Sequence, residues 1–253
     1  MKTNLLALFC VFLLAISCKK DSSPTPSDIN LKKGLLLYVP FDGSMADSSG
    51  NANPVTGVGG AFLTYDEHGN ANSAFGATGS GERILVTNNG SIKFDTAVTL
   101  SANIMTRTGG RYGIMELVDN TNGQSYAVGM ATGSTPPYRF DYSVSNHLAT
   151  CGSISSNANI FSDTATFIPE VESWYNLIVT FHKGTLSAYV NGKLVRTRSG
   201  GDNTVALCPS AKVIIGGWWD GDPAAINGKI DEVRIYNRVL NADEIAELSK
   251  EFQ

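Results

Sequence analysis

The sequence predicts an all-β protein, either an antiparallel sandwich or a barrel. Of its 253 residues only 17% are charged and 26 are glycine, which favours many strands and turns over long helices. From Gly34 onward, short apolar or alternating segments follow one another, separated by turn-forming residues. The net charge is -4 without a long basic run, which argues against nucleic acid as a partner.

The strands are expected in the segments whose side chains are apolar or alternate between apolar and polar. The first, 34–41, is apolar and runs into a loop rich in turn formers. The others are 82–86, 97–106, 112–119, 125–130, 138–144, 174–181, 185–190, 193–198, 212–218 and 229–236.

A three-stranded meander is predicted between Trp174 and Arg198. Side chains of 174–181 alternate between two faces, and a short turn then leads into the next strand. Asn191-Gly192 is the dipeptide most typical of a two-residue hairpin, because both positions need positive φ.

A short helix is predicted at the C-terminus. Asn241 is a good N-cap, and Glu244 three residues later completes a capping box. Leu240 and Ile245 fit a hydrophobic staple. We expect this helix to lie against the edge of the sheet.

The N-terminus has the features of a targeting segment. Lys2 precedes an apolar run, Leu5–Ile16, which is too short for a stable membrane span, and small residues lead to Cys18. Residues 1–17 resemble a bacterial, Bacteroidetes-like lipoprotein signal that is cut before a lipidated Cys18. The alternative is an ordinary secretory signal that is cut elsewhere. Residues 18–33 are polar and contain two prolines, which predicts a flexible tether.

This reading places the protein in the cell envelope, lipid-anchored, in the outer membrane of a Gram-negative bacterium. Cys151 and Cys208 would then lie in an oxidising compartment. A disulfide between them would stabilise the fold by roughly 4 kcal/mol. The alternative is two buried thiols.

Several motifs together resemble the laminin-G-like branch of the concanavalin A-like lectin/glucanase superfamily. They are "LLLYVPFDGSMADSSGN", the meander ending in "YVNGKLV", "KVIIGG" and "NGKIDEVRIYNRVLNADEI". The resemblance covers nearly all of 34–253 as one domain. It implies a jelly-roll sandwich of two antiparallel sheets with a concave face, followed by the short C-terminal helix. Residues 79–159 match less closely.

Adjacent acids, Asp231 and Glu232, stand within the last predicted strand. Neighbouring side chains of a strand point to opposite faces, so adjacency does not make them an acid/base couple. The E-x-D-x-x-E pattern of related glucanases is absent, and Glu116 and Asp119 have a different spacing. The three histidines, His68, His147 and His182, are scattered and read as surface residues. An enzyme is therefore the minority interpretation.

Asp231 shares its strand parity with Val233 and Ile235, which predicts that it points toward the core side. Such a carboxylate needs a partner. Asp42 follows the first strand, and related proteins often gather such acids around calcium, so we expect Asp42 and Asp231 to bind calcium. The alternatives are hydrogen bonds to backbone amides or pairing with Arg234 or Arg238. Glu232 is expected to pair with Arg234 on the other face.

The composition of the loop "GGWWDGDPAAINGK" predicts a flat aromatic surface on which a sugar could bind. Trp218 and Trp219 are adjacent, so both cannot face the core, and Asp220 and Asp222 supply hydroxyl acceptors. The alternative is one core Trp and one Trp covered by another loop. Two further aromatic residues, Tyr112 and Tyr138, and Arg139 lie in the divergent middle and are expected on the same face.

Three functions follow from this reading. The leading one is a membrane-tethered, non-catalytic module that binds a glycan or mediates adhesion in the envelope. The second is a divergent glycan-cleaving enzyme, a hydrolase or lyase, on the same scaffold. The third is a structural protein that binds another envelope protein.

Overall fold

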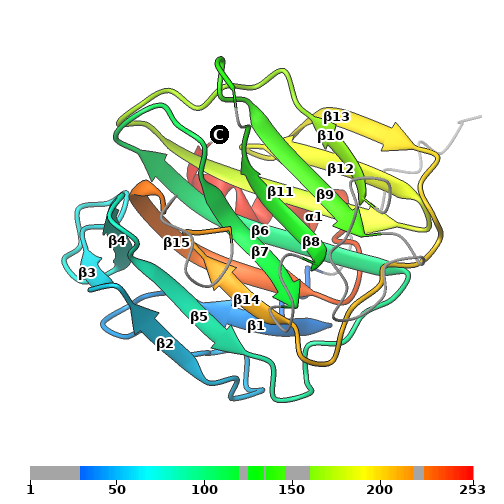
Figure 1. Cartoon of the computed structure of the whole chain (residues 1–253), viewed down its shortest axis with the longest axis horizontal. Helices are drawn as coiled ribbons and strands as arrows, with labels where there is room; N and C mark the ends of the chain where they lie inside the picture. The colour runs from blue at the N-terminus through cyan, green and yellow to red at the C-terminus, as the bar shows by residue number, and fades with distance from the viewer. Residues whose placement is uncertain (1–28, 120–124, 134, 146–159, 219–224, 253) are drawn as a thin grey trace, which may run out of the picture.

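Figure 1 shows a computed structural model of the chain, which describes residues 29–119, 125–133, 135–145, 160–218 and 225–252. These residues form a sandwich of two antiparallel sheets with one short C-terminal α-helix, so the predicted all-β fold is confirmed. None of the described helices is long and apolar enough to span a membrane. Outside the described residues lie the predicted signal peptide, most of the tether, Cys18, Cys151, Trp219, Asp220 and Asp222.

The larger sheet has eight strands in the order β13-β12-β11-β6-β15-β4-β3, and β1 also pairs with β15. The strands are β1 (Leu35–Val39), β3 (Phe62–Thr64), β4 (Ala74–Thr78), β6 (Ala97–Thr106), β11 (Trp174–His182), β12 (Thr185–Val190), β13 (Lys193–Ser199) and β15 (Asn227–Tyr236).

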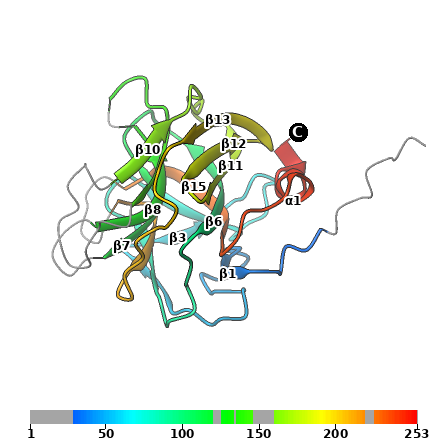
Figure 2. The same ribbon diagram turned by 90° about the vertical axis from the view of Figure 1, so that its right-hand side faces the viewer.

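The smaller sheet has seven strands in the order β10-β9-β8-β7-β14-β5-β2. They are β2 (Val55–Val58), β5 (Arg83–Thr87), β7 (Gly113–Asp119), β8 (Ser125–Thr132), β9 (Phe140–Ser145), β10 (Ile160–Thr164) and β14 (Lys212–Ile215). Figure 2 shows the sandwich turned by 90°, with α1 beside the larger sheet.

All the predicted strands are present, and the meander β11-β12-β13 turns at Asn191-Gly192 with positive φ at both residues. Four short strands, β2, β3, β4 and β10, were not predicted. Gly57 interrupts β2, Gly76 interrupts β4, and β3 has only three residues, so none of these shows a sustained alternation.

β6 shows how one strand serves two faces of the larger sheet. Leu100, Ala102 and Ile104 belong to the hydrophobic core between the sheets. The alternate residues, Ser101 and Asn103, face the other way, and yet they are also buried. Another segment must therefore cover this outer face.

The C-terminal helix α1 (Ala242–Leu248) provides part of that cover. The Asn241 side chain accepts the backbone N–H of Glu244 at 2.9 Å, and the Glu244 carboxylate accepts the backbone N–H of Asn241 at 3.0 Å, so the predicted capping box is present. Ile245 packs with Ile178 of β11 and Tyr236 of β15. The expected position at the sheet edge is wrong, because β11 and β15 lie inside the sheet on either side of β6.

A β-bulge in β15 overturns the predicted orientation of Asp231. The pairing with β6 shifts between Asp231 and Arg234, and Glu232 between them has a φ of 52°. The bulge breaks the strict alternation, so Val233 lies in the core while Asp231 lies on the outer face beside Asn103. The expectation that Asp231 points toward the core side with Val233 and Ile235 is wrong.

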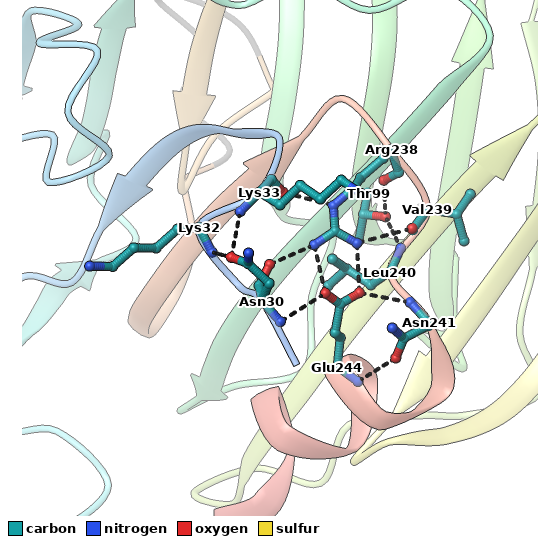
Figure 3. Close-up of polar contacts among 9 residues, drawn as sticks. All are labelled: Asn30, Lys32, Lys33, Thr99, Arg238, Val239, Leu240, Asn241 and Glu244. Atoms are coloured by element: carbon teal, nitrogen blue, oxygen red, sulfur yellow. Dashed lines mark hydrogen bonds and ion pairs between the residues drawn. The ribbon is translucent and has the colours of Figure 1, made fainter. Parts of the chain in front are cut away.

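Arg238 and Glu244 join both ends of the domain on this outer face, as Figure 3 shows. The Arg238 guanidinium donates to both oxygens of Glu244, at 2.6 and 2.7 Å. It also donates to the backbone carbonyls of Asn30 and Lys33, at 2.9 and 2.7 Å. The hydrogen bonds from Arg238 are the main reason that the pKa of Glu244 is lowered.

We predict that Glu244→Ala destabilises the fold by about 3 kcal/mol, because it leaves the Arg238 guanidinium without its partner in a mostly buried site. The matched control is Glu247→Ala in the same helix, since Glu247 is exposed and its Lys250 contact is 3.7 Å long. Chemical denaturation measures both. Equal effects from the two variants would contradict the role of the pair.

The same pair gives a pH dependence. The pKa of Glu244 is lowered in the folded state, so its stabilisation is complete above the unfolded pKa, about 4.3. It is lost as the pH falls through the folded pKa. The stability difference between wild type and Glu244→Ala should therefore shrink below about pH 4.

Candidate functional site

Two regions of the surface combine the chemistry that a binding site needs. The first, which we call the acidic cleft, has a volume of about 650 Å³ and lies on the outer face of the larger sheet. Its lining comes from the loop after β3, from β15 and from the C-terminal segment. It comprises Leu31, Asp42, Asp66, Glu67, His68, Asn70, Asn103, Asp231, Glu232, Arg234, Glu247, Leu248, Lys250 and Glu251.

A chain of amide hydrogen bonds holds the floor of the acidic cleft. Asn103 donates from Nδ2 to Glu67 at 3.0 Å and accepts at Oδ1 from Asn176 at 2.8 Å. The hydroxyl of Ser249 donates to Asn176 Oδ1 at 2.7 Å. Ser249 of the C-terminal segment therefore donates a hydrogen bond to Asn176 of β11, which in turn donates to Asn103 of β6.

Asp231 lines this cleft together with the carboxylates of Asp42, Glu67 and Glu232. It is 4% exposed, and its Oδ1 accepts the backbone N–H of Glu232 at 2.8 Å. Burial, followed by the charge of Glu67, raises the pKa of Asp231 to about 9. Burial also raises the pKa of Glu67, whose Oε2 is buried without a hydrogen-bond partner. Both carboxyls would be better satisfied by a cation.

The residues fit the calcium site expected from the sequence. Asp42 and Asp231 line the same cleft, and the surrounding donors are mainly carboxylate and amide oxygens, which are the ligands of a hard cation. Arg234 and Arg238 pair with Glu232 and Glu244 instead of Asp231. Within the described part of the chain, no arginine forms an ion pair with Asp231.

Glu232 lies in the same cleft as Asp231, contrary to the expectation that it faces the other way. The reason is again the bulge centred on Glu232. Its carboxylate accepts the hydroxyl of Tyr38 at 2.8 Å and pairs with Arg234, so the predicted Glu232–Arg234 pair is present. The Arg234 guanidinium also stacks 4.1 Å from the centre of the Tyr38 ring.

The second region, which we call the aromatic rim, consists of Arg111, Tyr112, Tyr138 and Trp218. Tyr112 and Tyr138 line one depression of about 40 Å³ together with Thr and Gly residues, Ile168 and Pro169. Tyr112 is mostly buried, and its hydroxyl is 2.6 Å from that of Thr108. Tyr138 is partly exposed.

The other part of the rim is Trp218, which lies beside Arg111. It is partly exposed, and the Arg111 guanidinium lies 4.5 Å from the centre of its ring. The backbone of Gly113 is pressed so closely against Gly217 that a side chain at Gly113 would collide with it. This contact brings the backbone at the start of β7 beside the backbone of Gly217 and Trp218. The structure thus places Tyr112 and Tyr138 in one depression and Trp218 beside Arg111, while Trp219, Asp220 and Asp222 lie outside its described part.

Sequence reasoning missed most of the acidic cleft. Asp66, Glu67 and Glu251 were not singled out, and His68 was read as an isolated surface residue, whereas its Nε2 lies 2.9 Å from Glu251. An available signal was Asn103, an amide on the polar face of a strand whose other polar residues there, Thr99 and Ser101, carry only hydroxyl groups. The distant pairing of the loop after β3 with the C-terminus left no local pattern.

From the sequence, Glu116 was described only by its spacing from Asp119. It is fully buried on β7, and burial raises its pKa well above the usual value, partly offset by the charge of Arg111. Its Oε2 has no hydrogen-bond partner. Cys208 is buried, and the predicted partner Cys151 lies outside the described residues, so the disulfide stays a prediction.

The fold and the sequence together define the class of protein. A laminin-G family model, described as the concanavalin A-like lectin/glucanases superfamily, matches residues 78–246. The chain belongs to this family, as its C-terminal motif predicted. No curated protein is similar enough in sequence to count as a match.

Solved structures share the fold at low sequence identity. Domain 4 of AbnA, a GH43 extracellular arabinanase from Geobacillus stearothermophilus in complex with arabinotriose, has a TM-score of 0.64 and 16% identity. The match covers 85% of this chain and 98% of that domain.

Two toxin domains are similar as well. The binding domain of Paraclostridial Mosquitocidal Protein 1 has a TM-score of 0.66 and 16% identity, covering 88% of this chain and 53% of that one. The receptor-binding domain of botulinum neurotoxin mosaic serotype C/D has a TM-score of 0.64 and 16% identity, covering 88% and 52%. This chain therefore spans about half the length of these toxin chains.

Proposed function

We propose that the protein is a non-catalytic glycan-binding module of the cell envelope. The observation that carries the proposal is the aromatic rim. Partly exposed rings of Tyr138 and Trp218 offer flat apolar surfaces, and Arg111 and the hydroxyl of the exposed Thr108 offer hydrogen-bonding groups. The arabinanase domain of the same fold was crystallised with arabinotriose, which supports a sugar ligand.

A glycan-array screen of the protein tests the proposal. We predict that Tyr138→Ala and Trp218→Ala each weaken binding of the best ligand by at least about tenfold, or about 1.4 kcal/mol, because an aromatic contact surface is lost. Tyr65→Ala is the matched control, since Tyr65 is 57% exposed and precedes the acidic cleft. Unchanged affinity in both rim variants would contradict this binding site.

We also infer that calcium binds in the acidic cleft, with Asp42 and Asp231 as carboxylate ligands. Bound calcium would offset the repulsion between Asp231 and Glu67 and would stabilise the bulge in β15. Its contribution to stability would be about 2.7 kcal/mol at a calcium concentration about 100 times the Kd.

Chelator should therefore lower the melting temperature of the wild type when calcium is present beforehand. Asp231→Asn should remove this sensitivity, because one carboxylate ligand is lost. A wild type that melts at the same temperature with and without chelator and with added calcium would refute the calcium site.

The envelope location rests on the N-terminal sequence. We propose that Cys18 is lipidated after removal of residues 1–17 and that 18–33 tether the domain to the outer membrane. Cys18→Ala should release the protein from membranes or leave the precursor uncut, as fractionation and immunoblotting would show. An unchanged fractionation and processing pattern would contradict the anchor.

A second candidate function is glycan cleavage. One observation favours it, the convergence of Glu67, Asp231 and Glu232 in one cleft, because glycoside hydrolysis uses a pair of carboxyl groups. Incubation with the glycans found on the array, followed by analysis of chain length, separates the two functions. Intact glycans support the binding module, and shortened products support the enzyme.

A further inference from the structure

The mouth of the acidic cleft carries a group of side chains that calcium binding would not use. His68 belongs to the loop after β3, and Glu251 belongs to the C-terminal 3-10 helix η2 (Lys250–Phe252). His68 Nε2 lies 2.9 Å from Glu251 Oε2. One ligand atom from each of Glu67, His68 and Glu251 lies within 4.8 Å of the other two.

A second observation is an unsatisfied carboxylate oxygen in the same cleft. Asp231 is 4% exposed and lines the same cleft, and its Oδ1 accepts the backbone N–H of Glu232. The Oε2 atom of Glu67 is buried and lacks a hydrogen-bond partner. Buried carboxylate oxygens without donors are costly unless a cation satisfies them.

The lysine and arginine of the cleft are already engaged. Arg234 pairs with Glu232, and Lys250 lies 3.7 Å from Glu247. Among the described residues, neither a lysine nor an arginine forms an ion pair with Glu67, Asp231 or Glu251. In the part of the chain that the structure describes, His68 is the basic side chain that contacts these carboxyl groups, through Glu251.

We propose that Glu67, His68 and Glu251 form a binding site for a divalent transition metal such as Zn²⁺. An imidazole nitrogen with two carboxylate oxygens suits zinc, whereas calcium takes oxygen ligands. Bond lengths of about 2.0–2.2 Å in a tetrahedron require ligand atoms about 3.3 Å apart. The His68 and Glu251 side chains are 51% and 57% exposed, so small rotations can close the distances around the ion.

Such a site would connect two segments that are distant in sequence. The metal would link the loop of Asp66–Asn70 to η2 and so hold the C-terminal segment over the polar floor of the cleft. Three protein ligands leave a fourth position for water or for a ligand atom. This inference does not depend on glycan binding at the aromatic rim.

Calorimetric titration of the untagged protein with zinc chloride tests the site. We expect one saturable site, and we expect His68→Ala to weaken zinc binding by at least about tenfold, as loss of one ligand should. Glu251→Gln should also weaken it. His182→Ala is the matched control, because His182 is an exposed histidine at the end of β11 and should leave zinc affinity unchanged.

A melting curve in chelator shows whether each variant keeps its fold, since His68→Ala should then melt like the wild type. Zinc affinity that is the same in His68→Ala, Glu251→Gln and the wild type would overturn the proposal. So would an equal loss in His182→Ala. Displacement of bound zinc by an equal concentration of calcium would also overturn it, because His68 would then have no role in selecting the metal.

Discussion

The bulge at Glu232 determines which side chains of the central strand β15 point into the core and which point to the outer face of the larger sheet. Without it, strict alternation would place Asp231 with Val233 and Ile235 in the hydrophobic core, where an unpaired carboxylate is strongly unfavourable. The bulge adds one residue to β15 at Glu232, whose φ is positive, so Val233 and Ile235 remain in the core. Asp231, Glu232 and Arg234 all become available to the cleft on the outer face.

The outer face depends in turn on the C-terminal segment. Ile245 covers apolar residues of β11 and β15, and Ser249 completes the hydrogen-bond chain through Asn176 and Asn103. The Arg238–Glu244 pair fixes the start of this segment to the chain at Asn30 and Lys33. The cleft is therefore assembled from the beginning, the middle and the end of the domain, and its shape depends on all three.

The sequence predicted what local patterns encode. Alternation in 97–106 and 174–181, the Asn191-Gly192 turn and the capping box at Asn241 depend on neighbouring residues, and each is present. The larger architecture followed from a resemblance carried mainly by the C-terminal motif. The bulge did leave a local signal that the sequence analysis did not use: Asp231 and Glu232 stand side by side between Ile230 and Val233 and so interrupt the alternation. The pairing with β6 shows the shift at the same place.

The candidate sites show the same limit. Tyr112, Tyr138 and Trp218 were chosen for their chemistry, and only the fold shows that the two tyrosines share one depression while the backbone of Gly113 touches that of Gly217. Glu67, His68 and Glu251 were missed because almost the whole domain separates the histidine from its C-terminal partner. Contacts between such distant segments arise from topology, which the spacing of residue types does not contain.

The central claim is that a glycan binds at the aromatic rim and leaves the acidic cleft free. NMR spectra of the tryptophan indole N–H groups during titration with the best array ligand test it most directly. Trp218→Phe identifies the Trp218 signal, and Trp174, which lies on the outer face beside Lys229, is the internal reference. We predict a saturable shift of the Trp218 signal with Trp174 unmoved. A saturable shift of Trp174 with Trp218 unmoved would contradict the account.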